Sequence, residues 1–154
     1  MRAISNRLRA GFLLILLCGY LGAVRASAQA GKQPAEWWFP GDLAALQQAA
    51  NAEEKFYFVE VSTTPCRWCT MLEQELNADS SARAYLQQYY LAKKADISTA
   101  DGRRLQRTYG VRQFPTVLLF SPQGEMIVQS EGYLPAKLFV DMLEEYRREA
   151  LTAE

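Results

Sequence analysis

The sequence contains no histidine and only three cysteines, so it is poor in the residue types that bind transition metals. A structural zinc ion needs about four nitrogen or sulfur ligands. Cys18 lies within an apolar segment near the N-terminus, which leaves Cys66 and Cys69 as candidate ligands. Two thiols are too few for a zinc site within one chain. We therefore predict no metal and no other cofactor.

An excess of charge of one sign is also lacking. The 17 basic residues balance 17 acidic ones, and most of the basic residues are scattered along the chain. The pair Arg103-Arg104 is typical of a solvated helix face. A nucleic-acid surface requires positive charge gathered on one face. We therefore predict no nucleic-acid partner.

One long apolar run is present, from Ala10 to Val24, and three arginines precede it. The run is short for a membrane span and leads into Ala26-Ser27-Ala28-Gln29-Ala30, which contains two small-x-small cleavage sites. We predict that residues 1–30 are a secretory signal peptide, cleaved after Ala28 or Ala30. The mature protein would be periplasmic or secreted and have no stable membrane span. An uncleaved membrane anchor is the alternative.

Residues 31–154 are long enough to bury one hydrophobic core, and we expect a single domain there. Apolar periodicity, cap residues and turn residues predict alternating strands and helices. Their alternation predicts an α/β fold with a central mixed sheet flanked by helices on both faces. Strands are expected at Phe56–Ser62, Tyr90–Ile97, Thr116–Phe120 and Met126–Glu131, and helices after Asp42, from Cys66 with a kink or restart at Asn77-Ala78-Asp79, at Asp101–Tyr109 and after Pro135.

Two cysteines three residues apart, in Cys66-Arg67-Trp68-Cys69, lie where the strand pattern gives way to a helical one. The first turn of a helix presents unpaired N–H groups and the positive end of the helix dipole, which favour a thiolate. Cys66 is therefore predicted to be a nucleophile. Cys69, one turn further on, is placed to resolve a mixed disulfide at Cys66, so that the two form a redox-active disulfide.

The residues between the cysteines suit substrate binding. Arg67 would help to stabilise the Cys66 thiolate, and Trp68 would offer a broad apolar surface to a polypeptide. Other interpretations of a C-x-x-C pair are a metal-handling site, such as that of a copper carrier, or a structural clip. A clip is disfavoured because so short a loop constrains the unfolded chain little.

Three features together resemble the thioredoxin family. The first is Cys66-Arg67-Trp68-Cys69 after an apolar strand, and the second is the segment from Tyr109 to Phe120, with Phe114-Pro115 before another apolar strand. The third is Glu60, six residues before Cys66, where thioredoxins have a buried aspartate and protein disulfide isomerases a buried glutamate. The resemblance implies a thioredoxin-like fold, a cis Phe114–Pro115 bond and contact of Phe114 and Pro115 with substrate.

Glu60 is expected to act as a proton relay for Cys69. It lies in an apolar run, and burial raises the pKa of a carboxyl group, which makes its carboxylate a better proton acceptor. The alternative is an exposed residue on an edge strand.

The long segment from Thr70 to Tyr89, together with Gly132-Tyr133-Leu134-Pro135, most resembles exported thioredoxin-like proteins. These are akin to the C-terminal domain of bacterial thiol:disulfide interchange transporters and to thioredoxins of sulfur-oxidation operons. This resemblance implies a monomeric reductase of protein disulfides that a redox partner protein resets. The pair Arg67-Trp68 replaces the Gly-Pro of cytoplasmic thioredoxins, and potentials in such proteins span about −270 to −120 mV. A disulfide oxidase or isomerase is therefore an alternative, and a third is a peptide-docking module in which the cysteines take no part.

Overall fold

Four strands form one mixed sheet at the centre of the computed structural model, which describes residues 37–153. Their order across the sheet is β2 (Tyr90–Asp96), β1 (Phe56–Ser62), β3 (Thr116–Phe120) and β4 (Met126–Glu131). β1 pairs parallel with β2 and antiparallel with β3, and β3 pairs antiparallel with β4. The predicted mixed sheet is confirmed. Cys18 and the predicted signal peptide lie outside the described residues.

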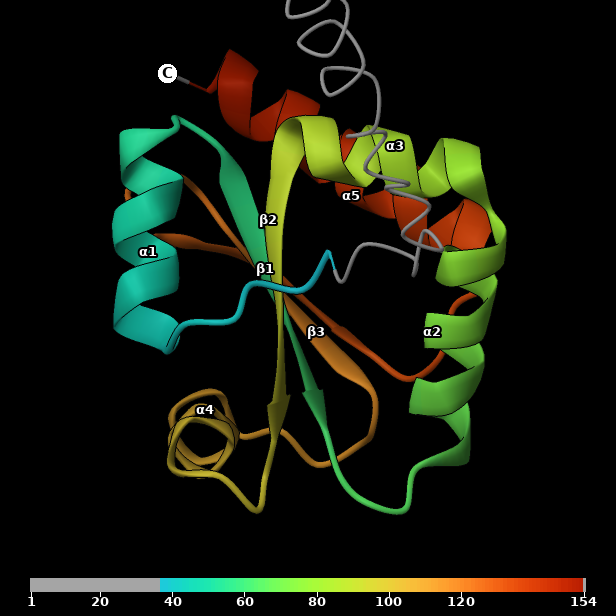
Figure 1. Cartoon of the computed structure of the whole chain (residues 1–154). Helices are drawn as coiled ribbons and strands as arrows, with labels where there is room; N and C mark the ends of the chain where they lie inside the picture. Colours follow the sequence, from blue (N-terminus) through green and yellow to red (C-terminus); the bar gives the residue numbers. More distant parts are fainter. Residues whose placement is uncertain (1–36, 154) are drawn as a thin grey trace, which may run out of the picture. The chain divides into compact units, whose positions relative to one another are not determined.

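Five helices cover the two faces of the sheet in this part of the chain (Figure 1). One face packs against α1 (Leu43–Ala52) and α4 (Ala100–Tyr109). The other packs against α2 (Arg67–Ala78), α3 (Ser80–Tyr89) and α5 (Ala136–Thr152). None of the helices among residues 37–153 is long and apolar enough to cross a membrane.

Side chains at the helix ends explain several boundaries. The Asp42 carboxylate accepts a hydrogen bond from the backbone N–H of Ala45 and begins α1. Asp79 accepts from two N–H groups of the next turn and so separates α3 from α2, as the predicted restart requires. Gly110 ends α4 in the left-handed conformation, with φ of 64°, which glycine adopts without steric cost.

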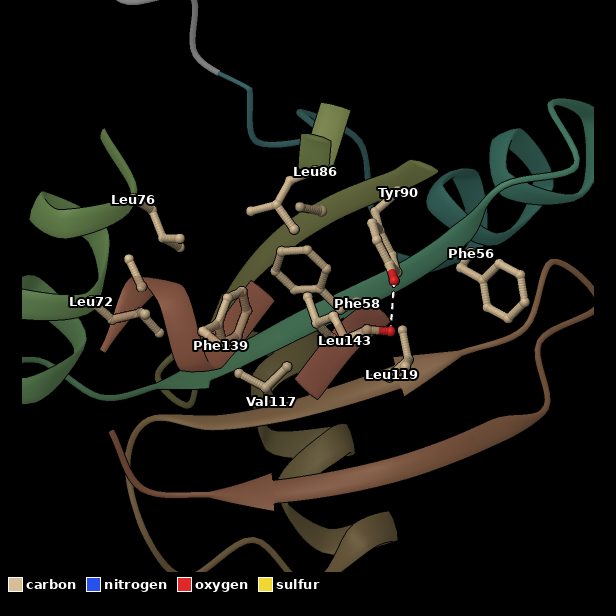
Figure 2. Close-up of a cluster of buried hydrophobic side chains, with 12 residues drawn as sticks. Phe56, Phe58, Leu72, Leu76, Leu86, Tyr90, Val117, Leu119, Phe139 and Leu143 are labelled. Atoms are coloured by element: carbon tan, nitrogen blue, oxygen red, sulfur yellow. Dashed lines mark hydrogen bonds between the residues drawn. The ribbon is translucent and has the colours of Figure 1, made fainter. Parts of the chain in front are cut away.

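Every residue of β1 is buried, because this strand lies inside the sheet and has helices on both faces. Its side chains alternate between the faces. Tyr57, Val59 and Val61 belong to the cluster beneath α1 and α4. Phe56 and Phe58 belong to the cluster beneath α2, α3 and α5, in which the Tyr90 hydroxyl donates a hydrogen bond to the Leu143 carbonyl over 2.7 Å (Figure 2).

Loops that are far apart in the sequence meet where the central strands β1 and β3 end, at one end of the sheet. β1 ends at Ser62 and leads directly to the cysteines, while β3 begins at Thr116, opposite Val61. The Pro115 carbonyl accepts a hydrogen bond of 2.8 Å from the N–H of Gly132, which follows β4. The fold therefore gathers the C-x-x-C loop, the Phe114-Pro115 segment and the loop before α5.

Candidate active site

Cys66 and Cys69 are joined by a disulfide bond with an S–S distance of 2.02 Å. Cys66 is the N-cap of α2, in extended backbone conformation, and its sulfur accepts a hydrogen bond of 3.1 Å from the N–H of Cys69. Cys66 is half-buried, whereas Cys69 is only 6% exposed. The more accessible cysteine is thus the one at the helix end, where backbone N–H groups favour a thiolate.

Hydrogen bonds hold the loop that carries Cys66. The Thr64 hydroxyl donates to Asp96 at the end of β2 over 2.7 Å, and the Cys66 carbonyl accepts from the hydroxyl of Thr70 over 3.0 Å. Hydrogen bonds from Ser98 and Thr64 lower the pKa of Asp96. The peptide bond between Thr64 and Pro65 is cis. The disulfide is therefore anchored both to its own helix and to the neighbouring strand.

Trp68 is 48% exposed beside the disulfide, and its ring stacks on that of Tyr133, with 5.4 Å between centroids. The exposed guanidinium of Arg67 lies 5.5 Å from the Trp68 ring centroid. Tyr133 was not among the predicted site residues, although it follows Gly132 in a loop that ends at Pro135. The three side chains make an aromatic surface with one positive charge.

Glu75 connects the Tyr133 loop to α2. Its carboxylate accepts hydrogen bonds from the Tyr133 hydroxyl and from the N–H of Ala136, the first residue of α5. These bonds, that from Tyr133 first, lower the pKa of Glu75. Sequence analysis missed this contact because the partners are 58 residues apart.

The Phe114–Pro115 bond is cis, and Pro115 is buried immediately before β3. Phe114 is half-buried and packs against the cluster beneath α1 and α4. Its side chain is therefore shared between this core and the surface.

Glu60 is 1% exposed, in a strand with a neighbour on each side, so it is not the edge-exposed residue of the alternative interpretation. Neither of its carboxylate oxygens has a hydrogen-bond partner among residues 37–153. Burial raises the pKa of Glu60 to about 7, while Lys94 acts to lower it and Glu73 to raise it further. A carboxylate with such a pKa is a stronger base than an exposed one.

Glu73 and Lys94 are site residues that sequence analysis missed. The Lys94 ammonium lies 2.6 Å from the Glu73 carboxylate, which connects β2 to α2. Both line a groove of about 650 Å³ that also borders Cys66 and Cys69. The available signal was a pair of lysines within an otherwise apolar strand.

The donor set for a metal is small. No group of three or more histidine, cysteine, aspartate and glutamate side chains in residues 37–153 is arranged to hold a metal ion. The described residues that come together near the cysteines are instead an aromatic surface and buried or paired carboxyl groups.

A mixed sheet covered by helices on both faces, with a cysteine pair bonded at a helix N-terminus, is the arrangement of a thiol:disulfide oxidoreductase. The chain belongs to the family of thioredoxin-like domains, which it matches over residues 43–147. The fold suggests protein thiols and disulfides as substrates.

Solved structures agree with this assignment. A candidate disulphide isomerase from Bacteroides thetaiotaomicron is 25% identical, with a TM-score of 0.65 over 71% of this chain and 90% of that one. A thioredoxin from Thermus thermophilus is 19% identical, with a TM-score of 0.62 over 70% and 84% of the two chains. A thioredoxin-fold protein from Helicobacter pylori is 20% identical, with a TM-score of 0.57 over 62% and 73%. Curated proteins give no significant match.

Proposed function

We propose that this protein is an exported reductase of protein disulfides that works by dithiol exchange at Cys66-Arg67-Trp68-Cys69. The observation that carries the proposal is the asymmetry of the cysteine pair. The more accessible cysteine caps α2, and the buried one lies on the helix face that packs toward the sheet. This arrangement suits an attacking Cys66 and a resolving Cys69.

The reduced protein would act in two exchange steps. The Cys66 thiolate attacks a substrate disulfide, so that a mixed disulfide forms and one substrate sulfur leaves as a thiolate. The Glu60 carboxylate accepts the proton of the Cys69 thiol, and the Cys69 thiolate attacks Cys66. The second substrate sulfur then leaves as a thiolate, and the substrate has gained the two electrons that the cysteine pair has lost. A partner dithiol would reduce the new disulfide again.

Substrate binding is proposed at Arg67, Trp68, Phe114 and Pro115. The exposed Trp68 ring offers apolar contact next to the more accessible cysteine. The Tyr133 ring stacks on the Trp68 ring. The loops that carry these residues meet at one end of the sheet. An extended polypeptide would contact both loops while its disulfide reaches Cys66.

A reduction assay on the purified protein tests the reaction. With dithiothreitol or a partner dithiol as electron source, we expect it to reduce the disulfides of insulin, and the Cys66→Ser variant to be inactive. Cys69→Ser is the matched variant, which should retain attack but not resolution and so accumulate mixed disulfides with substrate. A pair of cysteine variants that both keep full activity would contradict the proposed role of the cysteines.

Disulfide isomerisation is the second candidate, favoured by the likeness to the candidate isomerase from Bacteroides thetaiotaomicron. The midpoint potential of the Cys66–Cys69 couple in glutathione buffers separates the two. A reductase should have a midpoint potential of about −270 mV and an isomerase one of about −180 mV. A potential near the second value, with reactivation of scrambled ribonuclease, would favour isomerisation.

Export is supported by the N-terminal arginines, the apolar run and the small-x-small sites of residues 1–30. Cell fractionation of a tagged full-length chain should place it outside the cytoplasm. N-terminal sequencing should find a mature chain that begins at Gln29 or Gly31. A full-length chain retained in the membrane fraction would indicate the uncleaved anchor.

A further inference from the structure

The cation nearest in the sheet to the buried Glu60 forms its ion pair with another residue. Glu60 on β1 and Lys94 on β2 are register partners in a parallel pair, so their side chains leave the same face of the sheet from backbones about 4.8 Å apart. The Lys94 ammonium nevertheless bonds to Glu73 over 2.6 Å. Both Glu60 oxygens lack hydrogen-bond partners within residues 37–153.

Several contacts fix Lys94 in this position. Glu73 lies four residues after Cys69 on α2, one helical turn along the same face. The Lys94 ammonium also lies 5.7 Å from the centroid of the Trp38 ring. Lys94 and Glu73 are each about one third exposed, whereas Glu60 is 1% exposed. A long lysine side chain beside two carboxylates is thus held by the more exposed one.

We propose that Glu73 is a positioning residue, which holds the Lys94 ammonium away from Glu60 and thereby keeps Glu60 free to accept and carry a proton. Two charged groups act on the pKa of Glu60 in this arrangement. Glu73 belongs to α2, and Lys94 belongs to β2. The register partner on β3 is Val117, which carries no charge.

The consequence for the reaction rests on the proposed function, in which Glu60 takes the proton of Cys69. If the ammonium moved to Glu60, the carboxylate would be stabilised and would become a weaker base. The Glu73 pair therefore leaves Glu60 with the basicity that the resolving step needs. Its exposed position also lets solution conditions act on the pair, since salt weakens exposed ion pairs.

The test is a titration of Glu60 in the oxidised full protein, in which the disulfide-bonded cysteines do not titrate. The carboxyl carbon shift of Glu60 in NMR spectra is followed against pH. Glu73→Gln should lower the apparent pKa of Glu60 by about one pH unit, because the released ammonium pairs with the carboxylate. No decrease would overturn the proposal.

A second background separates positioning from simple repulsion between the carboxylates. Glu73→Gln is repeated in a Lys94→Met protein, or in Lys94→Gln if the methionine variant does not fold. Positioning through Lys94 predicts that the decrease falls to less than half in this background. A decrease of half or more would show that Glu73 acts directly on Glu60 and would overturn the proposal. Glu145→Gln, at an exposed position on α5, is the matched control and should leave the titration unchanged.

The pH profile of disulfide reduction distinguishes this inference from the proposed function. If Glu60 is the relay, Glu73→Gln should shift the acid limb of the profile to lower pH by the same amount as the titration. A titration that shifts while the acid limb stays in place would support the positioning role and contradict the relay role of Glu60. The two ideas therefore fail on different measurements.

Discussion

The two faces of the sheet differ in whether they bury a carboxyl group. Toward α1 and α4, β1 contributes Tyr57, Val59 and Val61, and β3 contributes Leu118 and Phe120. Thr116 of β3 is also buried on this face, and its hydroxyl donates a hydrogen bond to the Gln113 carbonyl. Toward α2, α3 and α5, β1 begins with Phe56 and Phe58 but continues with the buried carboxyl group of Glu60. The polar residue comes where the strand approaches the cysteines.

This difference shows that the face toward α2, α3 and α5 includes a group that lowers the stability of the folded protein when it is charged. Burying a carboxylate without a hydrogen bond is unfavourable, and the group responds by keeping its proton. The face toward α1 and α4 contains no such group among its buried core residues, so it can serve stability alone. The other face combines a core near Phe58 with a proton-binding group near Cys69.

The largest expected loss of stability comes from a substitution on the face toward α1 and α4. Leu118→Ala removes a fully buried side chain from that cluster and should lower the free energy of unfolding by about 2–5 kcal/mol. Urea unfolding of the oxidised protein measures this loss. Because Leu118 points away from Glu60, the pH profile of disulfide reduction by folded protein should stay unchanged. A shifted profile would break the division between the faces.

Glu60→Gln should have the opposite sign and depend on pH. Below pH 4.5 the carboxyl group is protonated in both the folded and unfolded states and adds no cost. Between pH 4.5 and about 7 the unfolded state loses its proton first, so stability falls as pH rises, and above about 7 the whole cost is present. At about 1.4 kcal/mol per pH unit, that cost is about 3 kcal/mol.

The glutamine variant lacks this cost, so its stability relative to the natural protein should grow by about 3 kcal/mol between pH 4 and pH 8. Urea unfolding at the two pH values provides the measurement. Glu145→Gln on α5 is the control, for which we expect no such growth. A difference for Glu60→Gln that is the same at both pH values would mean that the carboxyl group is not held in its neutral form by burial.

Local signals predicted much of the fold. The bounds expected for β1, β3 and β4 agree with the structure, because each is an apolar or alternating run between turn or cap residues. A kink or restart was predicted at Asn77-Ala78-Asp79, and the structure has a restart there because the Asp79 carboxylate caps the next helix. The strand around Lys94 was expected to reach Ile97 but ends at Asp96. Its two lysines interrupt the apolar alternation of the sequence. In the structure their ammonium groups bond to residues outside the strand.

The site was predictable only where its residues are close in sequence. Cys66 and Cys69 lie within one helical turn, and Glu60 lies near the end of the strand that precedes them. By contrast, Lys94 and Glu73 are 21 residues apart, and Tyr133 and Glu75 are 58 apart. Such contacts depend on how α2 packs against the sheet and α5, which no periodicity within either segment encodes.

The smallest effect concerns the residue beside Glu60 on the next strand. Val117 is the β3 register partner of Glu60 and belongs to the cluster beneath α2, α3 and α5, whereas the adjacent Leu118 faces α1 and α4. Val117→Ala should admit water near the carboxyl group and lower the pKa of Glu60 by about one pH unit, because less desolvation opposes the charged form. The carboxyl carbon shift in NMR spectra reports this change. Leu118→Ala is the matched neighbour, and a pKa of Glu60 that falls equally in both variants would show that water reaches this group through either face.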